Sequence, residues 1–222
     1  MSAEKINYLS GFISEARRKK FDEILQWRTR HITVVLEDIY QSHNASAVLR
    51  SCDCFGIQDV HIIENKNKYT LNPDVALGSS KWLDLIRYNS VSENTATCIQ
   101  SLKRSGYRIV AFSPHAKKDL QALPLTDPVA LFFGSELRGI SGEAGTLADE
   151  IVRIPMYGFT ESFNISVSVA ITLSHLVTKL HASGIDWKIK EDAQKKILLT
   201  WIRNSIHRYE LIEQEFDRAS KE

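Results

Sequence analysis

The stretch HITVVLEDIYQSHNASAVLRSCDCFGIQDVHIIE, residues 31–64, decides the fold class. It opens with HITVVLE (31–37), a short run rich in β-branched residues, which is typical of a buried strand. Residues 44–55 then carry apolar side chains at helical spacing and stop at Gly56, a residue type that commonly ends helices. A second strand-like run, DVHIIE (59–64), follows. This order of strand, helix and strand predicts the start of a parallel sheet.

The same alternation continues along the rest of the chain. Further strands are predicted at 107–112, 129–134 and 151–155, and further helices at 14–28, 91–104, 165–182 and 191–217. Short apolar strands between helices predict an α/β fold, a mostly parallel sheet with helices on both faces. Parallel sheets bind ligands at the carboxyl ends of their strands, so the segments that follow the strands should hold the chemistry.

Length and composition are those of an ordinary folded protein. The chain has 222 residues, of which 43% are hydrophobic and 25% charged, and these values exclude a disordered or low-complexity chain. Its three cysteines, Cys52, Cys54 and Cys98, are too few and wrongly spaced for a disulfide framework or a zinc site. We therefore expect no metal.

Neither a membrane span nor a secretion signal is predicted. The uncharged stretch between Glu161 and Lys179 is interrupted by serine, threonine, asparagine and histidine, so it is no bilayer helix. The first twenty residues lack an apolar core followed by a small-residue cleavage site. We expect a cytoplasmic protein.

Positive charge is concentrated in two segments. Residues 1–30 carry a net charge of +3 and residues 176–208 a net charge of +4, while residues 31–175 and 209–222 carry −3 each. Cationic segments of this kind supply phosphate contacts in proteins that bind polyanions. Two solvated helical faces explain the same pattern equally well.

Three segments that follow predicted strands do not look like simple packing. In the first, residues 44–56, Asn44 is expected to cap a helix that carries Arg50 nearly two turns further on. Arg50 lies beside the apolar stripe of that helix. It is either a surface group with a buried stem or a fixed cation that faces a phosphate or carboxylate.

The second segment is FGSELRGIS, residues 133–141. Gly134 and Gly139 permit a sharp turn and a close approach of the backbone to a ligand. The spacing is neither that of a dinucleotide fingerprint nor that of a phosphate loop. Glu136 is either a helix N-terminal charge or a site residue, since it follows a buried parallel strand.

The third segment is IPMYGFTESFNISVSVA, residues 154–170. It joins a strand to a long helix for which Asn164 is the expected N-cap. Ser162 and Asn164 together can also hold a substrate by hydrogen bonds.

In order and spacing, these three segments resemble motifs 1, 2 and 3 of the SpoU (TrmH-like) family of 2′-O-ribose RNA methyltransferases, within the SPOUT superfamily. The resemblance runs from about residue 30 to residue 180. It implies a C-terminal deep trefoil knot, S-adenosylmethionine bound in a bent conformation, and a homodimer with the active site at the subunit interface. Below, motif 1 denotes residues 44–56, motif 2 residues 133–141 and motif 3 residues 154–170.

Within this family the chain looks most like the tRNA branch, which methylates the D-loop guanosine. About thirty residues precede the first strand, ALGSSKWL (76–83) resembles a segment of that branch, and both ends carry helical extensions. The implied organisation is an extension over 1–30, a methyltransferase domain over 31–183 and an extension over 184–222. The alternatives are methylation of a ribosomal-RNA or other tRNA ribose, and a non-catalytic RNA-binding dimer.

The resemblance also assigns roles to residues. Arg50 is the catalytic residue near the 2′-hydroxyl, and the groups implied to position it and the ribose are Asn44, Glu136, Ser162 and Asn164. Because arginine is effectively always protonated, we expect it to stabilise the developing alkoxide rather than act as a free base. The implied cofactor-binding residues are Phe112, Gly134, Ile154, Met156 and Phe163. The basic residues expected to bind tRNA are Arg17, Arg18, Lys195, Lys196, Arg203 and Arg208.

Overall fold

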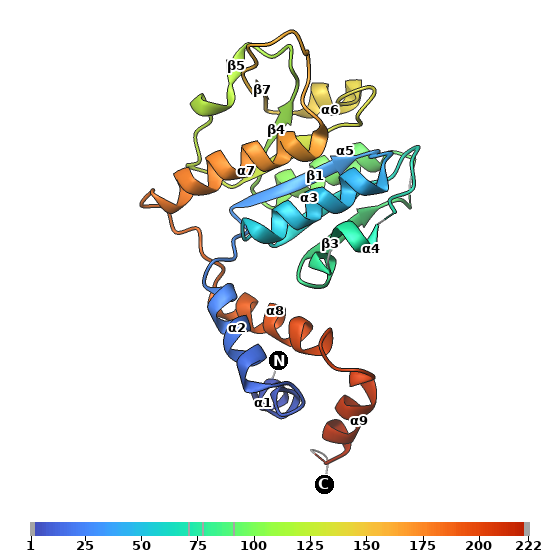
Figure 1. The fold of residues 1–222 in the computed structure, drawn as a ribbon, viewed down its shortest axis with the longest axis vertical. Helices are drawn as coiled ribbons and strands as arrows, with labels where there is room; N and C mark the ends of the chain where they lie inside the picture. Colours follow the sequence, from blue (N-terminus) through green and yellow to red (C-terminus); the bar gives the residue numbers. More distant parts are fainter. Residues whose placement is uncertain (1–2, 71, 77, 91, 220–222) are drawn as a thin grey trace. The chain divides into compact units, whose positions relative to one another are not determined.

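The computed structural model describes residues 3–70, 72–76, 78–90 and 92–219. It divides the chain into two compact units (Figure 1). The sheet unit is Thr29–Trp187, and the terminal unit combines Met1–Arg28 with Lys188–Glu222. The domain boundaries expected from the sequence, after residues 30 and 183, stay a prediction.

The described residues of the sheet unit form a seven-stranded sheet in the order β3-β2-β1-β6-β4-β7-β5, with every described strand pair parallel. The strands are β1 (Ile32–Glu37), β2 (Asp59–Ile63), β3 (Asp84–Tyr88), β4 (Arg108–Phe112), β5 (Lys118–Asp119), β6 (Val129–Phe133) and β7 (Glu150–Arg153). All five predicted strands are present. The sequence did not predict β3 and β5, which form the two edges of the sheet.

Helices cover both faces of this sheet, as predicted. On one face lie α3 (Ser42–Cys54) and α7 (Ile165–His181), packed against each other (Figure 1). On the other lie α5 (Asn94–Arg104) and α6 (Gly142–Leu147). The central strand alternates between them, since Val34 and Leu36 join the first core and Val35 joins the second. Both faces of β1 are thus buried, which explains its mostly apolar sequence.

The remaining short helices of the sheet unit are α4 (Pro73–Ala76), η1 (Ser79–Lys81) and η2 (Leu120–Ala122). Two predicted helix starts need comment. The helix predicted from Asn44 begins at Ser42 instead, with Gln41 at the N-cap, so the prediction of Asn44 as a cap is wrong. Residue 91, the predicted start of α5, lies outside the described residues, as does residue 77 of the segment 76–83.

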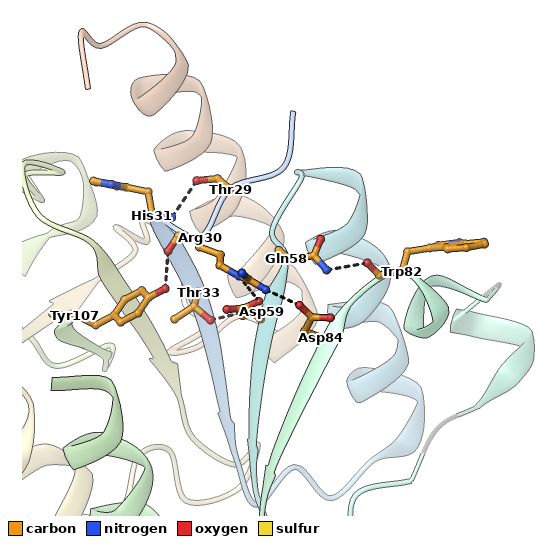
Figure 2. Close-up of polar contacts among 9 residues, drawn as sticks. All are labelled: Thr29, Arg30, His31, Thr33, Gln58, Asp59, Trp82, Asp84 and Tyr107. Atoms are coloured by element: carbon orange, nitrogen blue, oxygen red, sulfur yellow. Dashed lines mark hydrogen bonds and ion pairs between the residues drawn. The ribbon is translucent and has the colours of Figure 1, made fainter. Parts of the chain in front are cut away.

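An ion-pair cluster fastens the amino ends of three strands, away from the ends where ligands are expected (Figure 2). Arg30 donates from Nε to Asp59 at 2.9 Å and from Nη2 to Asp84 at 2.7 Å. The Tyr107 hydroxyl donates to the Arg30 carbonyl at 2.6 Å. Burial raises the pKa of Asp59 even though Arg30 opposes the shift. The cluster therefore ties β1 to β2 and β3.

The described residues of the terminal unit form four helices, α1 (Ala3–Ser10), α2 (Glu15–Leu25), α8 (Glu191–Arg203) and α9 (Tyr209–Ala219). Phe21 and the buried Trp201 pack edge to face, with ring centroids 5.5 Å apart. Ser14 caps α2 as predicted, accepting from the Arg17 backbone N–H. The single helix predicted over 191–217 is wrong, because the chain turns at Arg208, where φ is +53°.

Candidate functional site

A cavity of about 610 Å³ lies at the carboxyl ends of β4, β6 and β7. Its wall contains all five predicted cofactor-binding residues, Phe112, Gly134, Ile154, Met156 and Phe163. Four of the predicted catalytic residues also line it, namely Asn44, Glu136, Ser162 and Asn164. Segments far apart in the sequence therefore meet here as predicted from the strand order. The roles of these residues stay predictions.

Asn44 is the centre of the polar contacts in this cavity. Its Nδ2 donates to Glu136 Oε1 at 2.9 Å and to Gln41 Oε1 at 3.1 Å. Its Oδ1 accepts from Asn164 Nδ2 at 3.1 Å. Asn44 is only 3% exposed, so these bonds satisfy an amide that water hardly reaches. One side chain thus joins motifs 1, 2 and 3.

The Glu136 carboxylate is held by donors from the first turn of α3 and the residues before it. Besides Asn44, the backbone N–H groups of Tyr40 and Gln41 donate to it at 3.2 and 3.4 Å. Burial acts to raise the pKa of Glu136, but the hydrogen bonds from Asn44 and from backbone N–H groups outweigh burial and lower it. The carboxylate therefore remains charged in the wall of the cavity at neutral pH.

Motif 2 folds back on itself directly after β6. Gly139 donates its N–H to the Ser135 carbonyl at 2.8 Å, and its φ of +66° is one that glycine adopts freely. A Cβ on Gly134 would lie 2.0 Å from the Gly139 carbonyl oxygen. Both glycines are therefore needed for this tight loop, which presents Glu136 towards α3.

Motif 3 passes the cavity and then enters α7. Asn164 caps this helix as predicted, since its Oδ1 accepts from the Ser166 backbone N–H at 2.8 Å. The same side chain uses its Nδ2 for Asn44. Helix capping and site assembly are therefore functions of one residue here, and neither interpretation of Asn164 excludes the other.

Three comparisons with known proteins agree with this geometry. Residues 31–174 match the SpoU rRNA Methylase family. The chain is 44% identical over 211 residues to a tRNA (guanosine(18)-2′-O)-methyltransferase of Borreliella burgdorferi, covering 95% of each protein. It is 32% identical to the Thermus thermophilus protein of the same name, covering 86% of this chain and 97% of that protein.

The chain belongs to the SpoU methylase family. Its fold matches the crystal structure of the Aquifex aeolicus TrmH/SpoU tRNA modifying enzyme with a TM-score of 0.78 at 28% identity, over 87% of this chain and 98% of that one. The predicted family is thus confirmed. So is the predicted α/β class, with the trefoil knot that the SpoU fold carries.

One SpoU motif residue is missing from the cavity. Arg50, in the third turn of α3, is exposed and does not line it. Within the described part of the chain its side chain makes no hydrogen bond or ion pair. Arg138 of motif 2 is the one lysine or arginine among the described lining residues. A single chain therefore brings together every predicted catalytic group except the arginine.

Two other lining residues, Gln41 and His115, were not among the predicted site residues. Gln41 touches Asn44 and precedes α3, and its place directly before a helix was the available signal. His115 follows β4 and lacks any distinguishing pattern around it. The described residues contain neither a group of three acidic, histidine or cysteine side chains suited to a metal nor a helix able to span a bilayer.

Proposed function

We propose that this chain is a tRNA (guanosine(18)-2′-O)-methyltransferase, which transfers a methyl group from S-adenosylmethionine to the ribose 2′-oxygen of the D-loop guanosine. The observation that carries the proposal is the bonded set of Asn44, Glu136 and Asn164 on one cavity. Its specificity for tRNA rests on the relatives with this name that match nearly the whole chain. A cytoplasmic location follows from the proposed substrate.

The cavity suits the proposed methyl donor. Its volume lies in the range typical of small-molecule sites, about 300–1,000 Å³. Phe112 and Phe133 stack with their ring centroids 4.5 Å apart and give it an aromatic wall. Ile154, Met156 and Phe163 add apolar cover, and the Gly134 backbone permits close approach. When bound, S-adenosylmethionine supplies an electrophilic methyl group.

The polar residues act on the acceptor ribose. Asn44 holds the Glu136 carboxylate in place, and Ser162 and Asn164 border the same cavity. These groups orient the ribose by hydrogen bonds, which lowers the barrier by alignment. Arg50 stabilises the alkoxide that develops as the 2′-hydroxyl loses its proton, and an RNA phosphate accepts the proton.

The proposed active unit is a homodimer with the site at the interface, and two observations support it. Large apolar side chains of motifs 2 and 3 are exposed beside the cavity, with Leu137 90% and Tyr157 97% exposed. Arg50 does not line the cavity of its own chain. A second copy covers the apolar groups, and Arg50 of one copy serves the cavity of the other.

Complementation in mixed dimers tests this arrangement. Arg50→Ala and Glu136→Ala are each expected to abolish methyl transfer. A mixed dimer of the two variants regains one complete site if Arg50 acts across the interface, and regains none if it acts within its own chain. If mixed dimers of verified composition recovered no methyl transfer, the proposal of a shared site would be overturned.

The proposed methyltransferase domain is residues 31–183. The proposed RNA-binding residues lie in the two extensions, 1–30 and 184–222. Residues 1–2 and 220–222 of these extensions lie outside the described ones. Arg18, Lys195 and Arg203 already pair with Asp22, Glu191 and Glu213. In the described part, Arg17, Lys196 and Arg208 have no such side-chain partner. We therefore expect the second trio to contribute most to binding.

Two triple-alanine variants, one for each trio, separate these groups. Loss of three phosphate contacts lowers the slope of log K against log salt by about two to three. We expect that change for Arg17, Lys196 and Arg208, and a smaller one for the paired trio. Equal slopes for both variants and the wild type would place all six residues on a solvated surface.

Transfer of labelled methyl to unmodified tRNA, followed by mapping of the modified nucleotide, tests the function itself. We expect label on the ribose of guanosine 18 and none on ribosomal RNA. Label on ribosomal RNA alone would favour the other branch of the family. If neither RNA were labelled while RNA binding stayed intact, the chain would be a non-catalytic dimer.

A further inference from the structure

A buried carboxylate outside the proposed machinery lies close to motif 2. Glu37, the last residue of β1, is 2% exposed. Its Oε1 accepts from the Thr95 hydroxyl at 2.7 Å and from the Ser141 hydroxyl at 2.8 Å, and its Oε2 accepts from the Ser141 backbone N–H at 2.9 Å. No lysine or arginine of the described residues pairs with it. Three neutral donors therefore compensate a buried acceptor.

These donors lie where motif 2 ends. Ser141 is the last residue of motif 2 and the N-cap of α6, because its hydroxyl oxygen accepts from the Ala144 backbone N–H at 3.1 Å. Thr95 belongs to α5, and its hydroxyl also accepts from Asn65 Nδ2 at 2.9 Å. Glu37 therefore connects the end of motif 2 to the central strand and to a helix on the opposite face from α3.

The start of motif 2 is attached to the same strand. Phe133 is paired with Leu36 in the parallel ladder between β1 and β6. The chain thus leaves the sheet opposite Leu36 and returns at Ser141 to the next residue of β1, Glu37. Both ends of motif 2 are fixed at adjacent positions, and the loop between them carries Glu136 into the cavity wall.

We propose that Glu37 is a positioning residue for the methyl-transfer site. By holding Ser141 it keeps motif 2 in the shape that places Glu136 against Asn44 and shapes one wall of the cavity. Its contribution to catalysis rests on the proposed function, whereas its hold on motif 2 does not. Loss of the hold loosens the loop and weakens cofactor binding without altering the rest of the sheet.

Glu37→Gln is the test, because an amide keeps the shape but turns one acceptor atom into a donor. At least one of the three donors then faces an NH₂ group. Thr33→Val is the matched control. Thr33 is buried on the same strand and donates to the Asp59 carbonyl at 2.7 Å, at the end remote from motif 2.

Amide hydrogen exchange is the first readout and needs no ligand. In Glu37→Gln we expect faster exchange confined to 134–141, because at least one of the three donors loses its acceptor on residue 37. The control leaves 134–141 unchanged. Exchange in 134–141 equal to that of the control would overturn the proposal.

Cofactor affinity and turnover are the second readout. Loss of a hydrogen bond to a charged group raises the Kd for S-adenosylmethionine about tenfold in Glu37→Gln. The control lowers Tm but leaves Kd within twofold. A similar Tm loss in both variants with no change in Kd would reduce Glu37 to a stabilising residue. If the wild type bound no cofactor, the proposed function would fail while the exchange result would still decide the role of Glu37.

A milder pair covers the case in which Glu37→Gln does not fold. Thr95→Val removes one donor to Glu37, and Thr95→Ser restores it. We expect faster exchange in 134–141 and weaker cofactor binding only in the valine variant. Identical behaviour of the two variants would contradict the proposal.

Discussion

Replacement of Asn44 by aspartate reverses the central contact of the site without changing its shape. Asn44 Nδ2 lies 2.9 Å from Glu136 Oε1, so the variant sets two carboxylates against each other. Like charges about 3 Å apart repel by about 5 kcal/mol at an effective dielectric constant of about 20. Because Glu136 is partly open to water, we expect roughly half of this, about 2–3 kcal/mol, as lost stability at pH 8.

The sign of the pH dependence of stability distinguishes repulsion between the two carboxylates from simple loss of a hydrogen bond. In the wild type, burial acts against the charge, but hydrogen bonds lower the pKa of Glu136 below its usual 4.5. The stability that charged Glu136 contributes is therefore present above that value, and it fades as the pH falls through the lowered pKa. In Asn44→Asp the carboxylate pair shares a proton and its upper pKa rises. Stability is then retained at low pH and lost as the pH rises through the raised pKa.

Calorimetric melting at pH 5 and pH 8 measures this difference. Each kcal/mol shifts Tm by about 2–4 °C in a protein of this size, so Asn44→Asp should melt about 5–10 °C below the wild type at pH 8 and closer to it at pH 5. Asn44→Ala loses the same hydrogen bonds without adding charge, and its deficit should be similar at both pH values. If the difference between the two variants failed to grow from pH 5 to pH 8, the contact between Asn44 and Glu136 would be refuted.

Three further perturbations address other parts of the molecule. Gly134→Ala places a Cβ 2.0 Å from the Gly139 carbonyl oxygen, so titration should detect no cofactor binding, whereas Gly142→Ala, with open space at its Cβ, should bind normally. Arg30→Met leaves Asp59 and Asp84 without their cation, and urea unfolding should show a loss of about 2 kcal/mol that grows from pH 5 to pH 8; an equal loss at both would contradict the ion pairs. Glu213→Gln weakens the hold of Arg203 on α9, so amide exchange should accelerate over 209–219 alone.

The sheet was predictable where burial dominates the sequence. β1 and β6 are buried throughout and mostly apolar because helices cover both faces, and their runs stand out without other information. The edge strand β3 was missed because its five residues, DLIRY, are only half buried and include Asp84 and Arg87. β5 has two residues and carries no pattern at all. Partial burial thus weakens the signal that strand prediction uses.

The terminal helices show a second kind of limit. Residues 204–208 contain neither glycine nor proline, so nothing in NSIHR indicates a break between α8 and α9. The turn depends on Arg208 adopting a positive φ, which arginine rarely does. Such a conformation is selected by the packing around it, including the paired Arg203 and Glu213, and not by local preference.

The polar residues of the cavity were predictable because they lie in segments that follow strands, and the resemblance to the SpoU motifs assigned their roles. The rule that found Glu136 also applies to Glu37, which ends β1 in the same way. Only its buried contacts with Ser141 and Thr95 distinguish it.

Arg50 shows why a motif that is contiguous in sequence need not serve one cavity. Six residues separate it from Asn44, and at about 3.6 residues per turn they leave Arg50 about 120° around the helix from Asn44. Asn44 faces motifs 2 and 3 of its own chain, so α3 cannot direct Arg50 to the same place. The proposed homodimer accounts for this, because it supplies Asn44 and Arg50 to one reaction centre from two copies of α3. Helical periodicity thus favours the proposed shared site, and recovery of methyl transfer in mixed dimers tests it.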